Sequence, residues 1–468
     1  MSLKNACGTL IMALVVLATA GVARAQDGRG IRLYEEQLRV RMDQQQSSAR
    51  QEGFDAGGWF SFAFFHFDDA AAEKERVLRQ YELRLWGSYT LHGVHTFYVR
   101  GRTGLDDWNS GTNPQHEGGD QFNDPRVERA WYRFDFDRMM RNQTGQTPQS
   151  GFNVTVGREY FEIGSALVLA LPLDAVAINT HFGDWKLMAL LGKTVTDTPN
   201  IDTSAPVDDH MQRCFWGAEL RYAGFDRHEP YIYWLSQKDH TRPGPNPTNQ
   251  GFSYDSSYLG AGSRGSVLLP NLRYGTEFVF ETGKTFGDGA QHVQDDIHAF
   301  AFDAMLEYMF DVQRHPKVFF EYLWGSGDSD RRTTATSTIG GNRPGTQDNA
   351  FNAFGFRDTG LAFAPKIANL HIYELGASFF PWEDTKLFRK LEVGTKTYFY
   401  HKQMNGPISD PTADNDGRWV GWEWDVFANW RITSDLSWTV RYGNFFPGSV
   451  FDSQDCRKFL YSGVSYSF

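Results

Sequence analysis

The sequence predicts an all-β fold, a closed antiparallel transmembrane β-barrel of about 18 strands with short periplasmic turns and long extracellular loops. The clearest support comes from residues 419–430, where tryptophan, valine and alanine share one parity while Glu423 and Asp425 lie on the other. Side chains of a strand alternate between its two faces, so one face of this strand is apolar and the other polar. The chain ends on Phe468 after a further alternating segment, an ending typical of outer-membrane β-barrels.

Composition fits the same fold. Aromatic residues make up 15% of the chain, with 38 Phe, 20 Tyr and 14 Trp, and the mean hydropathy is low at −0.49. A barrel with a wet interior combines both properties, because half of each strand faces water. Beyond the N-terminal region, no stretch approaches the roughly 20 apolar residues of a transmembrane helix. A chain of this kind that spans a membrane must do so as a closed barrel, in which every backbone group is paired.

Residues 1–25 have the organisation of a secretory signal peptide. Lys4 supplies the positive start, residues 10–20 form a short apolar core, and residues 23–25 read Ala-Arg-Ala before the expected cleavage site. The apolar run is too short for a membrane anchor. We therefore expect export into the bacterial envelope and residence in the outer membrane.

The remaining chain divides into two parts. Residues 26–53 are polar and are expected to form an N-terminal periplasmic segment, whereas residues 54–468 form the barrel. Once the signal peptide has left with Cys7, only Cys214 and Cys456 remain. Two cysteines are too few for a disulfide framework, and the sequence leaves open whether they form one bridge.

Within the barrel segment, alternating stretches follow one another in regular succession, and each predicts one strand. Short turns and long loops alternate between them, as expected when one rim of a barrel is trimmed and the other elaborated. The predicted strands are 57–67, 77–89, 94–105, 127–136, 151–158, 174–183, 185–195, 213–223, 228–238, 255–263, 271–283, 295–310, 315–325, 369–380, 387–401, 418–430, 435–446 and 457–468. The predicted long loops are 106–125, 196–212, 239–254, 284–294, 326–368 and 402–417.

Charged residues gather on the parity opposite to the apolar one. The formal charge of the chain is −11, which argues against a nucleic-acid partner but does not exclude a locally basic lumen. Arginine presents a fixed fork of donors that matches a carboxylate, and a ring of arginines at a constriction would favour acidic solutes. Ion pairs that only stiffen the wall are the alternative. The candidate substrate-binding residues are Arg84, Arg100, Arg102, Arg129, Arg133, Arg158 and Arg441.

Acidic pairs offer a second type of chemistry. Glu277 and Glu281 share one strand face, as do Glu423 and Asp425, and two carboxylates can act as the acid and base of a glycosidase. Neither pair lies in a recognisable motif, so lining of the lumen is the preferred interpretation. The histidine spacing gives no zinc site, and no nucleotide-binding motif is present. The sequence therefore predicts no catalytic residue, no metal and no cofactor.

Several blocks of the sequence are distinctive. They are LRLWGSY at 83–89, RAWYRFDF at 129–136, the stretch from VGREYF to NTHF at 156–182, the long loop and strand at 340–379, and GWEWDVFANW at 421–430. In these blocks the chain resembles the alginate export porin family, which consists of AlgE-like outer-membrane β-barrels. The resemblance extends over most of residues 80–468 and is weakest between about 195 and 295.

The resemblance implies an eighteen-stranded barrel that exports a polyuronate through an electropositive constriction. Trp324 and Thr439 stand where the family pattern favours arginine, so another acidic polymer, or a neutral one, remains an alternative substrate. The arginines that match constriction positions of the family, or lie beside them, are Arg84, Arg129, Arg158 and Arg441.

From these observations we expect a passive outer-membrane channel that exports an anionic exopolysaccharide, an alginate-like polyuronate, through an arginine-lined constriction. A general or oligosaccharide-selective porin is the alternative, followed by an outer-membrane enzyme that modifies a polysaccharide. The expected partners are the anionic polysaccharide, outer-membrane lipid and a periplasmic scaffold of a secretion complex. A closed barrel has no free strand edge, so a monomer is expected. Loops 326–368 and 159–173 are candidate lids over the mouth.

Overall fold

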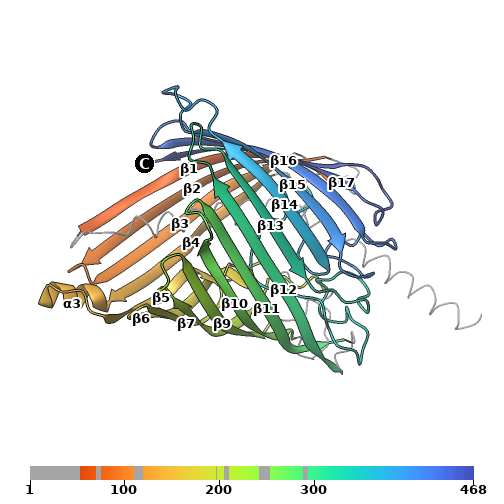
Figure 1. Cartoon of the computed structure of the whole chain (residues 1–468), viewed down its shortest axis with the longest axis horizontal. Coiled ribbons are helices and arrows are strands. Elements are labelled where there is room, and N and C mark those ends of the chain that lie inside the picture. The colour runs from red at the N-terminus through yellow and green to blue at the C-terminus, as the bar shows by residue number, and fades with distance from the viewer. Residues whose placement is uncertain are drawn as a thin grey trace, which may run out of the picture.

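The computed structural model describes residues 53–69, 75–109, 120–196, 198–204, 210–241, 253–287 and 293–468. The predicted signal peptide and nearly all of the predicted periplasmic segment lie outside these ranges and remain predictions. The described chain forms one tilted, twisted barrel with a short helix at one rim (Figure 1).

All eighteen predicted strands are present, which confirms the all-β fold. Their bounds are β1 Gly53–Asp68, β2 Arg76–Leu91, β3 His95–Trp108, β4 Asp120–Asp135, β5 Ser150–Ile163, β6 Leu169–Phe182, β7 Trp185–Thr194, β8 Arg213–Tyr222, β9 His228–Asp239, β10 Asp255–Ser266, β11 Leu272–Phe286, β12 Gln294–Met309, β13 Lys317–Gly325, β14 Leu370–Phe379, β15 Leu391–Lys402, β16 Trp419–Arg431, β17 Leu436–Pro447 and β18 Arg457–Ser467.

The barrel closes between its first and last strands. Each strand pairs antiparallel with its sequence neighbours, and β1 pairs with both β2 and β18. The terminal residue completes this seam: the Phe468 N–H donates to the Gly58 carbonyl and the Gly58 N–H donates to the Phe468 carbonyl, both at 2.9 Å. Closure leaves no edge unpaired among the eighteen strands that the structure describes, as a lipid environment requires.

The two faces of the wall follow the alternation seen in the sequence. On β2, Leu85 points outward and is 52% exposed, whereas its neighbour Arg84 points inward and is 9% exposed. On β16, Trp424 points outward and Glu423 and Asp425 are buried inside. Apolar side chains thus face lipid and charged side chains face the lumen, the arrangement of a transmembrane barrel.

Two elements differ from the sequence prediction. The connection between predicted strands 127–136 and 151–158, for which no element was predicted, contains a helix, α3 (Phe136–Thr144). The helix begins where the Arg138 N–H donates to the side chain of Asp135 and ends at Gly145, whose φ is +74°. Segment 159–173 is mostly strand, because β5 and β6 continue to Ile163 and from Leu169. The turn between them, 164–168, lies inside the barrel, as its contacts below show.

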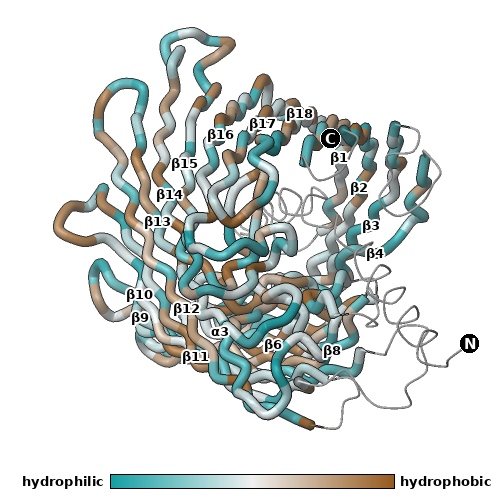
Figure 2. The backbone as a smooth tube through the Cα atoms, turned by 90° about the vertical axis from the view of Figure 1, so that its right-hand side faces the viewer, coloured by the Kyte–Doolittle hydropathy of each residue, from teal (hydrophilic) through white to brown (hydrophobic). Residues whose placement is uncertain are grey.

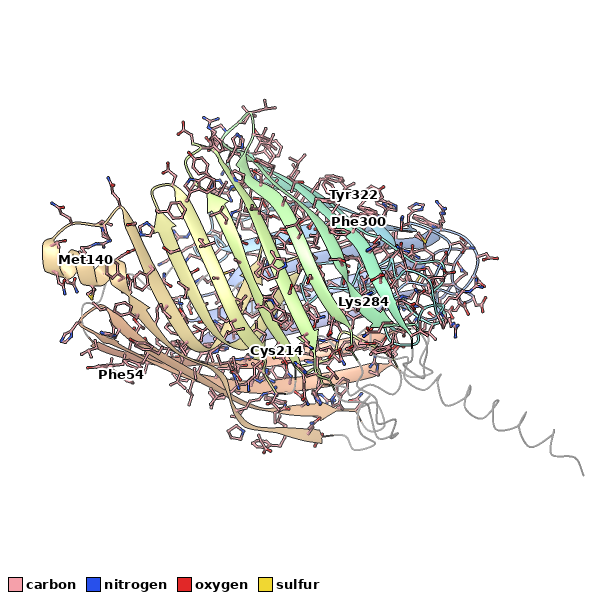
Figure 3. The ribbon with its side chains drawn as sticks, turned by 90° about the horizontal axis from the view of Figure 1, so that it is seen from below. Phe54, Met140, Cys214, Lys284, Phe300 and Tyr322 are labelled. Carbon is pink, nitrogen blue, oxygen red and sulfur yellow. The ribbon has the colours of Figure 1, made fainter. Side chains whose placement is uncertain are left out.

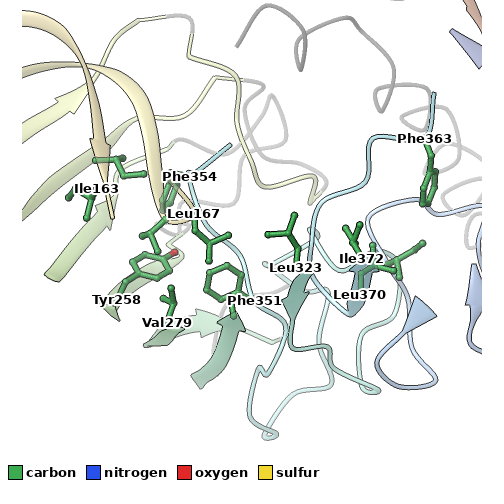
Figure 4. Close-up of a cluster of buried hydrophobic side chains, with 14 of the residues drawn as sticks. Ile163, Leu167, Tyr258, Val279, Leu323, Phe351, Phe354, Phe363, Leu370 and Ile372 are labelled. Atoms are coloured by element: carbon green, nitrogen blue, oxygen red, sulfur yellow. The ribbon is translucent and has the colours of Figure 1, made fainter. Parts of the chain in front are cut away.

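Extracellular loops fold back into the barrel and give it an apolar core. Phe351 and Phe354 of loop 326–369 pack with Leu167 against inward-facing residues of the wall such as Tyr258 (Figure 4). Phe354 also forms a parallel bridge with Leu169 at the start of β6. Figure 2, which looks along the long axis of the molecule, shows stretches of chain that cross the space enclosed by the strands.

The described residues also include both cysteines that remain after the signal peptide. Cys214 on β8 and Cys456 before β18 are both free thiols, so the bridge left open by the sequence is absent between them. Among the helices that the structure describes, none has the length and apolar character needed to cross a membrane.

Candidate functional site

Five of the seven candidate arginines project from three neighbouring strands into the lumen. The strand register places Arg84 of β2 opposite Arg102 of β3, and Arg100 of β3 opposite Arg129 of β4. Residues paired in this way share one face of a sheet, and the burial of Arg84, Arg100 and Arg129 identifies that face as the inner one. With Arg133, two residues further along β4, these side chains form what we call the arginine ladder.

A β-bulge supplies the carboxylate at the centre of the ladder. Between β3 and β4 the register jumps from Arg100–Arg129 to Gly101–Val127, which leaves Glu128 as an extra residue on β4. Glu128 accepts hydrogen bonds from Arg84 Nε, at 3.1 Å to each oxygen, and from Arg100 Nε at 3.0 Å. Bulges of this kind redirect a side chain, and here the result is one carboxylate held by several guanidinium groups.

A second carboxylate links the same arginines. Arg84 Nη1 donates to Glu82 at 2.8 Å, and Arg102 Nη1 lies 3.4 Å from Glu82 and 3.5 Å from Glu128. Burial lowers the number of waters that could screen these charges, so the pairs are stronger than exposed ones. The three arginines and two glutamates form a pre-organised network with an excess of positive charge.

The outer members of the ladder have separate partners. Arg129 pairs with Glu159 of β5 at 3.1 Å, and Arg133 Nε donates to the Thr155 hydroxyl at 3.0 Å. Aromatic rings lie beside the guanidinium planes and restrict them further. The ring contacts join Arg84 and Arg100 to Trp59, Arg133 to Trp131, and Arg129 to Tyr160.

Arg158 lies outside the ladder and on the other side of the wall. It is paired across the sheet with Asp174, and its Nε and Nη2 donate to the two oxygens of that carboxylate at 2.7 and 3.1 Å. Along β5 and β6 it shares the face of Val156 and Val176, which are 43% and 42% exposed. Arg158, a predicted substrate-binding residue, therefore does not line the lumen.

Arg441 faces the lumen but belongs to a different part of it. On β17 it pairs across the sheet with Phe427 and Tyr461, and it is 8% exposed. Its charge acts on Asp358 of loop 326–369. Burial alone would raise the pKa of Asp358, but the positive charges of Lys396 and Arg441 and a hydrogen bond from Lys396 bring that pKa below its ordinary value. Arg441 thus helps to hold a loop.

Opposite the arginine ladder, strands β8 to β16 carry an acidic wall. Its inward-facing carboxylates include Glu219, Glu277, Glu281, Asp303, Glu321, Glu374, Glu423 and Asp425. Several of them bind the backbone of an inserted loop. Glu277 accepts the Ser165 N–H at 2.5 Å, Glu219 accepts the Gly164 N–H at 2.6 Å, and Glu281 accepts the Asn352 N–H at 3.0 Å.

Glu423 shows the strongest anchoring. Its two oxygens accept three consecutive backbone N–H groups, those of Leu361, Ala362 and Phe363, at 2.5, 2.6 and 2.9 Å. Gly360 precedes them with φ of +109°, and a Cβ there would lie 2.5 Å from the Tyr400 hydroxyl. Only glycine allows the loop to approach the wall this closely. Three of the four residues in the acidic pairs seen in the sequence, Glu277, Glu281 and Glu423, therefore bind loops.

Two half-buried cations complete the attachment of loop 326–369. Arg357 reaches from the loop to Asp303, at 3.0 Å, and to Glu321. Lys396 of β15 lies 2.7 Å from Asp358 of the loop and 2.8 Å from Glu374 of the wall. Each cation neutralises a carboxylate that would be costly to bury alone.

Comparisons with known proteins agree with this architecture. A family model described as Alginate export matches residues 145–465. The chain belongs to the alginate export family. The match covers β5 to β18 apart from its last residues, whereas all five members of the arginine ladder lie outside it, on β2 to β4. A search of curated proteins gives no match.

Solved structures share the barrel fold with this alginate export family member. Similar chains are OpdK of Pseudomonas aeruginosa with vanillate (TM-score 0.55, 13% identity, 89% of this chain and 100% of that one), OccAB1 of Acinetobacter baumannii (0.55, 11%, 89% and 96%) and OccK5 of Pseudomonas aeruginosa (0.54, 13%, 89% and 98%). Family and fold together identify a channel protein of the bacterial outer membrane.

Residues central to the site were absent from the sequence prediction. Glu128 enters the lumen through a bulge that alternation does not reveal. Arg357 and Asp358 form ion pairs with residues of the strands. These partners are distant in the sequence: Asp303, for example, lies 54 positions before Arg357. The signal that could have found Glu128 is the adjacent pair of charged residues Glu128-Arg129, since two neighbours cannot both face the lumen on a regular strand.

Proposed function

We propose that this alginate export family member is a passive outer-membrane channel for an anionic exopolysaccharide, an alginate-like polyuronate, which passes along the arginine ladder. The observation that carries the proposal is the convergence of Arg84 and Arg100, from two neighbouring strands, on the single carboxylate of Glu128. A site built to hold one carboxylate among guanidinium groups fits the carboxylate of a uronate residue.

The resident carboxylates account for release as well as binding. Arginines fixed by Glu82, Glu128 and Glu159 are already oriented, so little conformational entropy is lost when a uronate approaches. The same glutamates compete with the uronate for the guanidinium donors, which keeps each contact weak. Conduction requires this balance, because a polymer must enter each position and then leave it. Synthesis on the periplasmic side would supply the driving force.

Planar-bilayer conductance of the refolded barrel tests the proposal. We expect anion selectivity, block by polyuronate, and a block that weakens roughly tenfold in Arg84→Ala and in Arg100→Ala, since charged hydrogen bonds contribute about 1.5–3 kcal/mol each. Arg264→Ala is the matched control: Arg264 also faces the lumen and pairs with Glu229 at 2.9 Å, but it lies on β10, away from the ladder. Cation selectivity, or an undiminished block in both ladder variants, would contradict the proposal.

A channel for small carboxylates is the second candidate. The ladder already accommodates isolated carboxylates, those of Glu82 and Glu128, so a monomeric acid would satisfy it as well as a polymer. The solved structure of OpdK with vanillate shows that a barrel of this fold can hold a small acid. Comparing block by a uronate monomer with block by the polymer distinguishes the two, because only a polymer track gives an affinity that rises steeply with chain length.

The proposal extends to the absence of catalysis and to the oligomeric state. We propose no catalysis, because Glu277 and Glu423 are occupied by loop N–H groups; unchanged chain length of polyuronate after incubation with the purified barrel would agree. We also propose a monomer that receives polymer from a periplasmic scaffold. Light scattering of the detergent-solubilised protein tests the monomer directly.

A further inference from the structure

A row of charged residues crosses the outer surface of the barrel near its extracellular rim. Five residues on five consecutive strands are directly paired in register: Arg158 with Asp174, Asp174 with Lys193, Lys193 with Cys214, and Cys214 with Lys238. Neighbouring strands are about 4.8 Å apart, so the row extends over roughly 19 Å. Figure 3 labels the fourth residue of the row, Cys214, and shows it away from Met140 of α3 at the periplasmic rim.

The row borders the lipid-facing belt. Two positions nearer the periplasm, the same strands carry Val156, Val176, Leu191 and Trp216, again paired in register. Leu191 is 62% exposed, as expected for a side chain in contact with lipid tails. Lys193 and Lys238 lie next to the extracellular ends of β7 and β9. The charges are therefore placed at the level where lipid headgroups begin.

Two lysines of the row carry uncompensated charge. Asp174 is engaged through both oxygens by Arg158 and is not paired with Lys193. Asp255, at the start of β10, accepts the Asp239 N–H at 2.8 Å. Within the described ranges neither Lys193 nor Lys238 forms an ion pair, and both are exposed. Further round the rim, by contrast, Lys284 is paired with Asp296 at 2.5 Å.

We propose that Lys193 and Lys238, with Arg158 beside them, form a binding site for the phosphate of an outer-leaflet lipid, the phosphorylated glycolipid of lipopolysaccharide. Two ammonium groups on strands two apart are separated by about 10 Å at their Cα atoms, and their flexible stems can converge on one phosphate from above the apolar belt. The small Cys214 between them leaves room for the headgroup. Leu191 and Trp216 below would contact its acyl chains.

This site is independent of the transported polymer. Its residues face away from the lumen, so no solute inside the channel reaches them. Arg158, which does not line the lumen, has a role in this site. Its ion pair with Asp174 keeps that carboxylate away from Lys193. The site would fix the rotation and height of the barrel wall on the side where β5 and β6 turn into the lumen.

Native mass spectrometry of the refolded protein, titrated with bisphosphorylated lipid A, tests the proposal. We expect Lys193→Gln/Lys238→Gln to bind lipid A roughly thirtyfold more weakly, since each lysine near a membrane surface contributes about a fivefold gain. Lys284→Gln, a lysine on the same outer rim that already has a partner, should bind within about twofold of the parent. Dephosphorylated lipid A should bind the parent as weakly as lipid A binds the double variant.

Three other outcomes of these titrations would contradict the proposed lipid site. Equal binding of lipid A by parent and double variant, or of dephosphorylated and phosphorylated lipid by the parent, would show that the lysines do not hold a lipid phosphate. Competition by millimolar inorganic phosphate would indicate a free-anion site instead. The conservative double variant Lys193→Arg/Lys238→Arg retains both positive charges and should still bind lipid A. A heat-dependent gel shift checks that each variant is folded.

Discussion

At Glu128 a single residue determines how the arginines of the lumen are arranged. Arg84 and Arg100 come from different strands, yet both direct Nε at the same carboxylate. The alternating pattern of a strand can predict which of its arginines face inward, because successive side chains point to opposite faces. It cannot predict their convergence, because this depends on the bulge at Glu128, which shifts the register by one residue.

Arg158 shows the limit of reasoning from family positions. Both the charge pattern and the resemblance placed it in the lumen, although the residues that share its parity on the strand are Val154 and Val156. The register agrees with the alternation and pairs Arg158 with Asp174 on the outer face. At the scale of a residue, the pattern of the strand was the better guide to side-chain direction.

Asp348, buried in loop 326–369, makes the stability of that loop depend on pH. Burial raises its pKa from 3.8 to about 6, although Arg331 donates to both of its oxygens at 2.8 and 2.7 Å. An acid with a raised pKa binds its proton more tightly in the folded loop than in the open one. Its stabilising contribution, up to about 3 kcal/mol, is complete below about pH 4 and is lost as the pH rises through about 6.

Hydrogen exchange measures this effect. After correction for the intrinsic pH dependence of exchange, amides near Asp348 should become less protected between about pH 4 and pH 6. Asp348→Asn, which cannot ionise, should remove that change, and amides of loop 403–418 in the same sample serve as an internal control. Protection that increases with pH in the parent protein would contradict the prediction.

At the scale of the element, strands and loops were predictable to different degrees. Each strand carries its own period of two, so all eighteen could be placed, with errors mainly at their ends. The insertion of the loops depends on contacts between distant residues, such as Ser165 with Glu277 and Phe363 with Glu423. No local pattern encodes such contacts. Because the loop partners of Glu277 and Glu423 are distant in the sequence, the acidic pairs could be interpreted as catalytic candidates.

The anchoring of loop residues 361–363 leads to the second prediction. Glu423→Gln removes the charge that three N–H groups share, and an amide oxygen accepts them less strongly. We expect the local opening free energy to fall by about 2 kcal/mol, and exchange of the Leu361, Ala362 and Phe363 amides to accelerate roughly thirtyfold.

Glu392→Gln provides the matched control for that variant. Glu392 also faces the lumen, but it accepts hydrogen bonds from Ser378 and Asn429, which are residues of the wall. Exchange at 361–363 should therefore be unchanged in this variant. Equal acceleration in both variants would mean that the barrel as a whole, and not the loop anchor, had been destabilised.

At the scale of the whole molecule, the barrel has two sectors of opposite charge. The arginine ladder occupies β2 to β4, and the acidic wall occupies β8 to β16 on the other side of the ring. Loop 326–369 covers much of the wall, with its N–H groups on Glu281 and Glu423 and its Arg357 on Asp303. The loop thus narrows the lumen and also neutralises the acidic sector, which would otherwise favour cations.

Replacing residues 340–366 with a short glycine–serine linker tests this division. The barrel wall remains closed, since β13 and β14 pair directly, but Glu281, Asp303 and Glu423 lose their loop partners. We expect single-channel conductance to rise and the reversal potential in a salt gradient to move towards cation selectivity. Adding Glu281→Gln and Glu423→Gln to the shortened protein should restore anion selectivity, because the arginine ladder is untouched. A shortened channel with the selectivity of the parent would show that the acidic wall does not contribute to the field in the lumen.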